Sequence, residues 1–206
     1  LNGSRDVRFY QSAVSPGGLR SERIQSAELG YVLNVPTWGL LFDARLFQDR
    51  LKDLVSEKLQ FTSFAPTNTG GLRMHGVELQ ASAQLSAAWA GFAHYRYLRS
   101  DDATTPLEQT QYSRHSGAFG LTHAWGDGWR VAFAYFGASG NGVGQRSFGR
   151  EDLTVSKSFV TGPGRARLSA TVRRLDNKTA SVYRDENTVY ESSYRDRLQL
   201  FGQLQL

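Results

Sequence analysis

Apolar and polar residues alternate with a period of two along most of this chain, the pattern of β-strands that have two different faces. In GVELQASAQL, residues 76–85, valine, leucine and alanine share one parity, while glutamate, glutamine and serine share the other. In RARLSATVR, residues 165–173, small and branched apolar residues oppose arginine, serine and threonine. The alternation therefore predicts an all-β protein.

Nine strands follow from this pattern, each bounded by Gly, Pro, Asn or Asp. They are predicted at about residues 23–34, 38–50, 72–85, 87–99, 113–125, 128–138, 151–160, 164–175 and 193–206. A tenth, weaker strand is predicted near residues 5–11. The last strand, RLQLFGQLQL, keeps leucine on one parity up to Leu206, as expected of a strand that pairs along its whole length in a closed wall.

The predicted connections alternate between short and long. Short turns follow Asn34, surround Ser86 and occupy residues 126–128 and 161–164. Long connections are expected at residues 12–22, 51–71, 100–112, 139–150 and 176–192. Short periplasmic turns and long extracellular loops are typical of outer-membrane barrels. We therefore predict a transmembrane antiparallel meander β-barrel with about ten visible strands, either complete in itself or part of a larger barrel.

Strand alternation alone does not distinguish a membrane barrel from a water-soluble β protein. No window holds the roughly 18 to 20 continuous apolar residues that a spanning helix needs, but barrel strands average to a low hydropathy because their residues alternate. A soluble sandwich would alternate too, and the loop lengths decide for the membrane. The tryptophans beside the short turns are then predicted at the periplasmic interface rather than in a soluble core: Trp38, Trp125 and Trp129.

Charged residues recur on the less apolar face, which we expect to line a wet lumen. Most are expected to form cross-strand ion pairs that hold the wall in register, and others to line a solute path. The predicted lumen-facing residues are Glu28, Asp43, Arg45, Glu78, Arg165, Arg167 and Arg173, together with His94.

Composition narrows the function classes. The chain has no cysteine, which excludes disulfides and thiol chemistry, and its net charge of +5 is scattered among acids rather than gathered as in a nucleic-acid-binding segment. With 40% apolar residues and 21 glycines against 5 prolines, a membrane-embedded β protein fits better than a disordered chain. The chain starts at Leu1 without a signal peptide, so we expect a processed protein or a piece of a longer one.

Three segments resemble the β-barrel of TonB-dependent outer-membrane receptors. GGLRSERIQSAELGY, residues 17–31, is similar to the family's loop that feeds a strand with Glu-Leu-Gly-Tyr. DARLFQDRLKDLV, residues 43–55, resembles the next strand, and NTGGLRMHGVELQAS, residues 68–82, the segment that ends in Gly-Val-Glu-Leu. Their common order and spacing over residues 17–85 make the resemblance specific.

The resemblance implies a single barrel domain over residues 1–206 that corresponds to the C-terminal part of a receptor in the bacterial outer membrane. Its implied partners are the bilayer with its lipopolysaccharide, the N-terminal part of the barrel, a plug domain, the TonB system and a small-molecule ligand. The lumen-facing residues would then contact the plug. The chain departs from the family in having no plug or TonB-contacting segment, and in ending on Leu206 instead of an aromatic residue.

Enzymatic and metal sites are poorly supported. SRHSG places His115 and Ser116 together, but neighbours on a strand point to opposite faces and no carboxylate accompanies them. The four histidines lack metal-ligand spacing, the acids of residues 176–191 lack calcium-site spacing, and no helix follows the glycine-rich residues 137–149 to hold a phosphate. We therefore expect no catalytic residue, metal or cofactor and no nucleic-acid partner.

The favoured function is a receptor that binds a scarce solute, such as a siderophore or a vitamin, on its long loops and passes it inward. The alternative is a small standalone outer-membrane barrel with a structural, adhesive or surface-binding role, and an outer-membrane hydrolase is a third. The sequence identifies neither the ligand nor the total number of strands.

Overall fold

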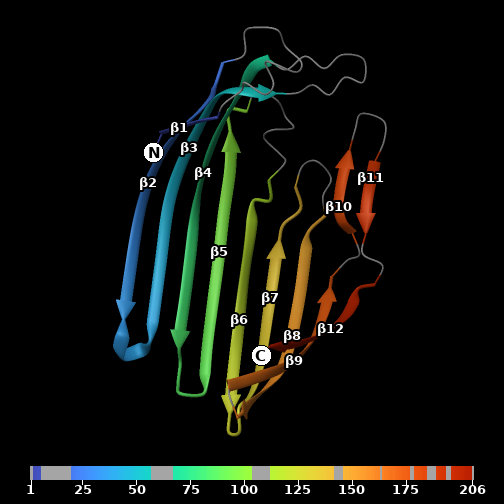
Figure 1. Cartoon of the computed structure of the whole chain (residues 1–206). Coiled ribbons are helices and arrows are strands. Elements are labelled where there is room, and N and C mark those ends of the chain that lie inside the picture. The colour runs from blue at the N-terminus through green and yellow to red at the C-terminus, as the bar shows by residue number, and fades with distance from the viewer. Residues whose placement is uncertain are drawn as a thin grey trace. The chain divides into compact units, whose positions relative to one another are not determined.

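The computed structural model describes residues 2–5, 20–56, 67–103, 112–141, 146–162, 164–176, 179–184, 189–193 and 196–205. These residues form β-strands joined by turns, with one short 3-10 helix, Pro36–Trp38, within them (Figure 1). The strands are β1 (Asn2–Arg5), β2 (Glu22–Val35), β3 (Leu40–Ser56), β4 (Thr67–Gln84), β5 (Trp89–Asp101), β6 (His115–Trp125), β7 (Trp129–Ala138), β8 (Phe148–Thr161), β9 (Gly164–Leu175), β10 (Thr179–Arg184), β11 (Val189–Ser193) and β12 (Leu198–Gln205). None of the described helices is long and apolar enough to cross a membrane.

Ten strands form one sheet in the order β1-β2-β3-β4-β5-β6-β7-β8-β9-β12. The registers of β5 to β9, of β9 with β12 and of β1 with β2 are antiparallel. Each strand of the series from β2 to β9 therefore pairs with the strand that follows it in the chain, which is the predicted meander.

The nine main strands are confirmed, with ends that shift by up to about six residues. β3 and β4 extend into the predicted loop of residues 51–71, since β3 runs to Ser56 and β4 starts at Thr67. The 18 residues of β4 span about 59 Å at about 3.3 Å per residue, more than the roughly 25 Å apolar band of a barrel wall requires. Period-two alternation alone does not mark where a strand leaves the hydrocarbon.

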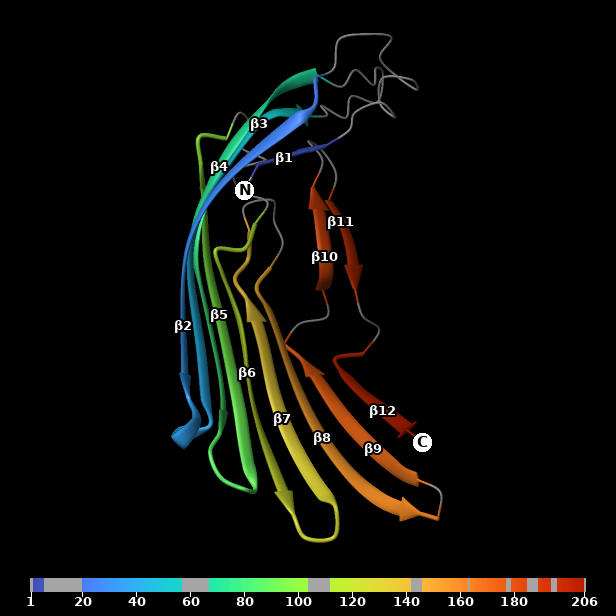
Figure 2. The ribbon, with the colours of Figure 1, turned by 60° about the vertical axis from the view of Figure 1, so that its left-hand side comes forward.

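The first strand and the connection at residues 176–192 differ in outcome from the other elements. A short first strand lies at Asn2–Arg5. Of the strand predicted near residues 5–11, residues 6–11 lie outside the described part. The connection predicted as a loop at residues 176–192 contains a hairpin, β10–β11, which forms its own two-stranded sheet above the end of β9 (Figure 2). Its polar strands lack the apolar parity that revealed the others.

The predicted short turns are confirmed. Residues 36–39, 85–88 and 126–128 connect β2–β3, β4–β5 and β6–β7, and β9 starts at Gly164 shortly after β8 ends at Thr161. In the β6–β7 turn, Asp127 and Gly128 have φ angles of 60° and 78°, the left-handed region that aspartate and glycine tolerate best. The backbone amide of Ser158 donates to the Gly128 carbonyl at 2.9 Å, which ties this turn to β8.

The chain folds as two compact units. Unit 1 comprises residues 1–30, 45–77 and 98–112, and unit 2 comprises residues 31–44, 78–97 and 113–206. Strands β2 to β5 contribute residues to both units, whereas β6 to β12 lie in unit 2. Each of the strands β2 to β5 therefore has one part in unit 1 and one part in unit 2, and the two parts carry different side chains.

In unit 2, exposure is inverted relative to a water-soluble protein. Along β8, Leu153 and Val155 are 48% and 39% exposed, whereas Ser156 is 8% exposed. Along β9, Leu168 and Val172 are exposed while Ser169 and Thr171 are half-buried. The described residues include four buried apolar side chains: Phe47, Leu72, Leu98 and Leu175. Because water-soluble domains of this size bury a large apolar core, the exposed apolar side chains require another apolar medium.

Candidate functional site on the polar face of unit 2

The register of unit 2 defines two faces. Partners across an antiparallel ladder share a face, so residues of one parity can be followed from strand to strand. One face holds a cross-strand row of apolar residues, and we call it the apolar face. The row consists of Leu121, Phe133, Leu153, Val172 and Leu200. The polar face is the opposite one, and its neighbouring row holds Thr122, Ala132, Thr154, Thr171 and Phe201.

The polar face of β7, β8 and β9 is basic. It carries one carboxylate, that of Asp152, and five arginines: Arg130, Arg150, Arg165, Arg167 and Arg173. The same face is otherwise built mainly from small and hydroxyl-bearing residues, and Arg130, Arg165 and Arg167 are exposed on it. Such a surface attracts anions or acidic protein segments.

Asp152 is the centre of the polar face. Its two oxygens accept hydrogen bonds from Nε and Nη2 of Arg173 at 2.9 and 3.1 Å, a bidentate pair across the β8–β9 ladder. Arg150 approaches the same carboxylate at 3.3 Å. The Asp152 side chain is 15% exposed, so this pairing acts in partly desolvated surroundings.

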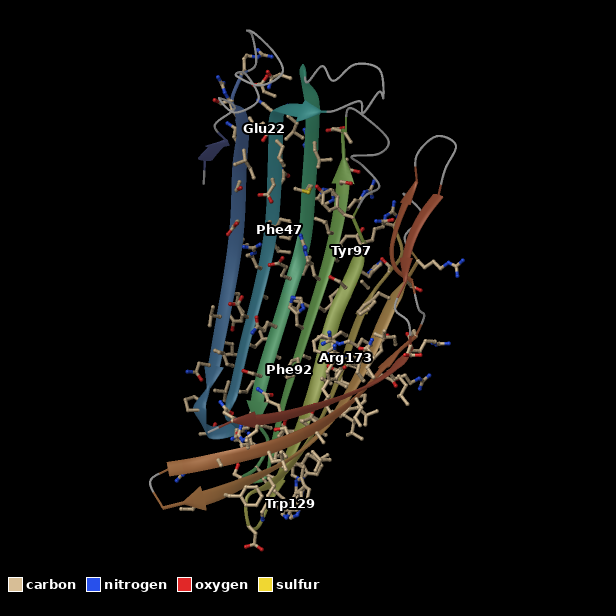
Figure 3. All side chains as sticks on the ribbon, turned by 45° about the vertical axis from the view of Figure 1, so that its right-hand side comes forward. Glu22, Phe47, Phe92, Tyr97, Trp129 and Arg173 are labelled. Atoms are coloured by element: carbon tan, nitrogen blue, oxygen red, sulfur yellow. The ribbon has the colours of Figure 1, made fainter. Side chains whose placement is uncertain are left out.

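Aromatic rings complete the Asp152 cluster. The guanidinium of Arg173 lies 4.8 Å from the ring centroid of Phe201 on β12, and that of Arg150 lies 4.1 Å from the ring of Phe136 on β7. Figure 3 shows Arg173 among the sticks of β9. The cluster therefore joins four strands on the polar face through one carboxylate, two arginines and two rings.

The arginines nearer the short turns are less constrained. Arg167 Nε donates to the hydroxyl of Ser158 at 3.4 Å. Arg130 and Arg165 are exposed and form no ion pair with any residue that the structure describes. Among the described residues, Arg130 and Arg165 near the turns therefore have no carboxylate partner, whereas Arg150 and Arg173 share that of Asp152.

Two further predicted residues of unit 2 lie on β3 and β4. Arg96 Nε of β5 lies 3.3 Å from a carboxylate oxygen of Glu78, which forms a cross-strand ion pair. Asp43 is exposed, and none of the ion pairs within the described ranges includes it. The expectation of cross-strand pairing thus fits Glu78 and Arg173 but not Asp43.

Unit 1 has a more balanced polar cluster. Arg45 of β3 lies 3.5 Å from Glu28 of β2, Arg73 lies 3.1 Å from Asp102, and His75 lies 3.5 Å from Asp101. A cavity of about 570 Å³ opens beside this cluster. Its lining includes Glu28, Phe47, Arg73, His75 and Asp101. Both signs of charge line this cavity, so it favours a polar rather than a strongly charged occupant.

Rings gather at the short turns of unit 2. Trp125 and Trp129 are register partners beside the β6–β7 turn, with parallel rings 6.2 Å apart. His123 stacks on Trp125 with ring centroids 5.6 Å apart, and its ring is tilted against that of Trp89 at 4.2 Å. Lys157 lies 5.1 Å from the Trp129 ring and donates to the Asp127 carbonyl. These five residues form an aromatic ladder on the apolar face, labelled at Trp129 in Figure 3.

Trp38 lies apart from that ladder. It ends the 3-10 turn between β2 and β3 and is 71% exposed. Its place beside a short turn matches the sequence expectation, while its role at a membrane interface stays a prediction. Sequence reasoning missed Trp89 and His123. His123 could have been indicated by its position two residues before Trp125, which puts both side chains on the same face of one strand.

Sequence reasoning also missed the partners of the charged residues. Arg96, Arg150 and Asp152 sit on the same parity as predicted lumen-facing residues, but only the strand register shows which of them meet. His94 lines a groove near Tyr95 and Ser116. The contribution of the predicted residues to solute or plug contact stays a prediction.

His115 and Ser116, the two residues weighed as a catalytic pair, do not share a face of the sheet. His115 and Ser116 pair with Tyr97 and Arg96, so they lie on opposite faces as expected. The Nδ1 atom of His115 hydrogen-bonds to the Tyr95 hydroxyl at 2.8 Å. Within the described ranges no three histidine or acidic side chains group as metal ligands.

Comparison with known proteins identifies the fold. Residues 3–202 match the family model described as TonB dependent receptor-like, beta-barrel. The structure is similar to a copper transporter, OprC, with a TM-score of 0.71, 19% identity, and coverage of 98% of this chain and 36% of that one. It is also similar to the ferric-catecholate import receptor Fiu of E. coli K12, with a TM-score of 0.71, 13% identity, and coverage of 98% and 31%.

A third structure extends the comparison to another iron transporter. FrpB of Neisseria meningitidis matches with a TM-score of 0.57 and 14% identity, over 91% of this chain and 32% of that one. No curated protein sequence matches the chain significantly. The chain thus spans about a third of the length of the solved structures it matches, and identities this low establish the fold alone.

Proposed function

Because the chain belongs to the TonB-dependent receptor-like β-barrel family, we propose that it forms a section of an outer-membrane barrel that imports a scarce solute. The receptor would capture the solute on its long extracellular loops and pass it inward beside a plug, with energy from the TonB system. Structurally similar proteins transport copper, ferric catecholates and iron, which favours a metal ion or a metal chelate such as a siderophore over a vitamin.

The observation that carries this proposal is that the same strands are apolar on one face and basic on the other. A water-filled interior tolerates the five arginines of β7–β9, and a bilayer tolerates the exposed leucines. Transport is proposed for a whole receptor that contains this section, since the chain spans 31% to 36% of two similar transporters.

The basic polar face favours an anionic partner. Arg130 and Arg165 have no carboxylate among the described residues, and Arg167 meets a hydroxyl. Metal chelates of carboxylate or catecholate type are anions, and so are acidic segments of a plug. We therefore infer that these arginines lie on the solute path or at the plug surface, and that the solute is an anionic chelate.

Uptake by a deletion strain tests the proposal. The gene is deleted, and uptake of a labelled ferric catecholate, copper and cobalamin is compared with the complemented strain and with a strain that lacks energy coupling. We expect loss of uptake of one anionic chelate in both the deletion and the uncoupled strain. Unchanged uptake of every solute, with the protein present in the outer membrane, would favour the standalone structural or adhesive barrel.

A matched pair of variants tests the role of the polar face. Replacing Arg165 and Arg167 together by glutamine should reduce uptake of the anionic chelate about tenfold, since two guanidinium groups would no longer attract it. Arg174→Gln provides the control, because Arg174 lies on the apolar face and pairs with Glu151 at 3.3 Å. Equal effects of both changes would remove the polar face from the transport path.

A further inference from the structure

Three residues of unit 1 meet at the ends of β2, β3 and β4 that lie away from the short turns. Asn68 of β4 accepts a hydrogen bond from the backbone amide of Arg20 at 2.5 Å and donates to the Arg20 carbonyl at 2.8 Å. It also donates to the carbonyl of Asp53 in β3 at 2.7 Å. The guanidinium of Arg20 lies 2.8 Å from the Asp53 carboxylate. Each member of this Asn68 cluster therefore contacts the other two.

The side chain of Asn68 takes the place of a strand neighbour for Arg20. In an antiparallel ladder, two directly opposite residues can exchange both N–H···O bonds. A side-chain amide has the same donor and acceptor as a peptide group, so Asn68 makes this exchange with Arg20 and uses its second amide hydrogen on Asp53. Aspartate has a similar shape but no amide hydrogens, so it would lose both donated bonds.

Asp53 has an unusual backbone conformation for a strand residue. Its φ angle is 55°, in the left-handed region, although Asp53 lies within β3. A left-handed residue changes the direction of a strand, and Figure 1 shows the end of β3 bending away from its first part. The bonds of the Asp53 carbonyl to Asn68 and of its carboxylate to Arg20 hold this conformation.

The Asn68 cluster joins the three segments that carry the family resemblance. Arg20 belongs to residues 17–31, Asp53 to residues 43–55 and Asn68 to residues 68–82. The sheet places β3 between β2 and β4, so its ladders do not pair the two outer strands with each other. The Asn68 side chain makes that connection at the point where β3 bends. The cluster therefore links strand ends that the sheet itself leaves unconnected.

We propose that the Asn68 cluster is a latch that gives the end of β3 two states. In the latched state, Asp53 is left-handed and meets Asn68 and Arg20. In the released state, Asp53 is extended, its carbonyl turns away from Asn68, and β3 continues straight. Long connections of a barrel leave from strand ends of this kind, so the latch sets the direction in which β3 ends on that side. The proposal concerns the conformation of unit 1 and holds whether or not the receptor transports a solute.

A second left-handed aspartate shows why Asp53 needs its partners. Asp102 has a φ angle of 53° and lies 3.1 Å from Arg73, but it directly follows Asp101, the last residue of β5. A left-handed residue after a strand end competes with no ladder. Asp53 lies inside a strand, where the extended conformation is the alternative, and such strain persists only while surrounding contacts over-determine it. Removing those contacts should therefore release β3.

Hydrogen exchange of the Arg20 amide tests the latch, because its acceptor is the Asn68 side chain. The full-length receptor is placed in lipid nanodiscs, and exchange is followed by mass spectrometry that resolves single amides. We expect slow exchange in the unmodified receptor and about tenfold faster exchange in Asn68→Ala, which removes the acceptor. Asn34→Ala is the matched control: Asn34 is an exposed asparagine of β2 beside the short turn, and its loss should leave the Arg20 rate unchanged.

Two variants of Asp53 separate the bend from the charge. Both lose the carboxylate, but glycine adopts the left-handed conformation freely, whereas valine strongly disfavours it. Asp53→Val should speed Arg20 exchange about tenfold, and Asp53→Gly only about twofold to threefold. The Ser158 amide, which donates to Gly128 at 2.9 Å in unit 2, reports in each variant that the wall is folded. Fast Arg20 exchange in the unmodified receptor, or equal rates in the two Asp53 variants, would overturn the proposal.

Discussion

The same strands form both faces of unit 2, because successive residues along each strand point to opposite faces. The row Leu121, Phe133, Leu153, Val172 and Leu200 lies on the apolar face, and each member is exposed. The next row, on the polar face, contains Thr154 and Thr171, whose hydroxyls share a hydrogen bond of 2.8 Å and are half-buried. A shift of one residue therefore changes the surroundings from hydrocarbon to a hydrogen-bonded wall.

This difference shows what specifies the fold. The apolar face leaves its leucines and valines exposed and depends on the membrane for its stability. The polar face is held by directional pairs such as Arg173 with Asp152, which fix the strand register. Changes on the apolar face should thus act through transfer into lipid, and changes on the polar face through lost partners.

A charge in the middle of the apolar face should have the largest effect. Leu153→Arg should lower the free energy of unfolding by about 2–4 kcal/mol, since an arginine would face the hydrocarbon midplane. Thr154→Arg, one residue further along β8, should change it by less than about 1 kcal/mol, because arginines already populate that face. Urea unfolding of the full-length receptor in lipid vesicles measures both. Similar costs for the two variants would contradict the difference between the faces.

Removing the carboxylate of the polar face should come second. Asp152→Ala leaves Arg150 and Arg173 without their shared acceptor and should cost about 1.5–3 kcal/mol of unfolding free energy. Glu151→Ala removes the exposed pair with Arg174 and should cost at most about 1 kcal/mol. The same unfolding experiment compares them, and a larger cost for Glu151→Ala would show that register is not fixed on the polar face.

The aromatic ladder at the turns should contribute less. Trp129→Ala removes the stack on Trp125 and the contact with Lys157, at a cost of about 0.5–1.5 kcal/mol beyond the area it buries. Trp38→Ala serves as the comparison, since Trp38 is 71% exposed and stacks on no described ring. Thermal unfolding in vesicles should show a lower midpoint for Trp129→Ala. If Trp38→Ala lowers it equally, the stack contributes no stability of its own.

The smallest effect is expected at the aromatic residue on the polar parity of β12. Phe201→Leu keeps an apolar side chain but removes the ring beside the Arg173 guanidinium, which should cost about 0.5–1 kcal/mol. The loss should disappear when Arg173 is already replaced by glutamine. A double-mutant cycle on unfolding free energies measures this coupling, and a coupling of zero would make Phe201 an unspecific filler.

Much of the fold is predictable because each barrel strand repeats a local pattern. Alternation and turn residues locate the nine main strands, and the family resemblance read from residues 17–85 is confirmed by a match over residues 3–202. The strand ends beyond the membrane are missed because exposed strand and loop have similar composition there. The β10–β11 hairpin is missed because its residues lack an apolar parity.

The site is only partly predictable. Parity alone indicates that Arg173 is on the polar face, but its partner Asp152 is 21 residues away and depends on the β8–β9 register. The Asn68 cluster is missed for the same reason, since Arg20, Asp53 and Asn68 come from three segments that meet only after folding. Sequence shows which face a side chain occupies, and register decides which neighbours it meets.

Accessibility along β8 tests the central claim most directly. The 206 residues contain no cysteine, so single cysteines can be introduced at positions 152 to 156 of the receptor and spin-labelled in bilayers. Labels at Leu153 and Val155 should collide with dissolved oxygen in the hydrocarbon, while labels at Asp152, Thr154 and Ser156 should be shielded from it. Oxygen accessibility that rises and falls with no period of two, or that peaks at Thr154, would contradict the account.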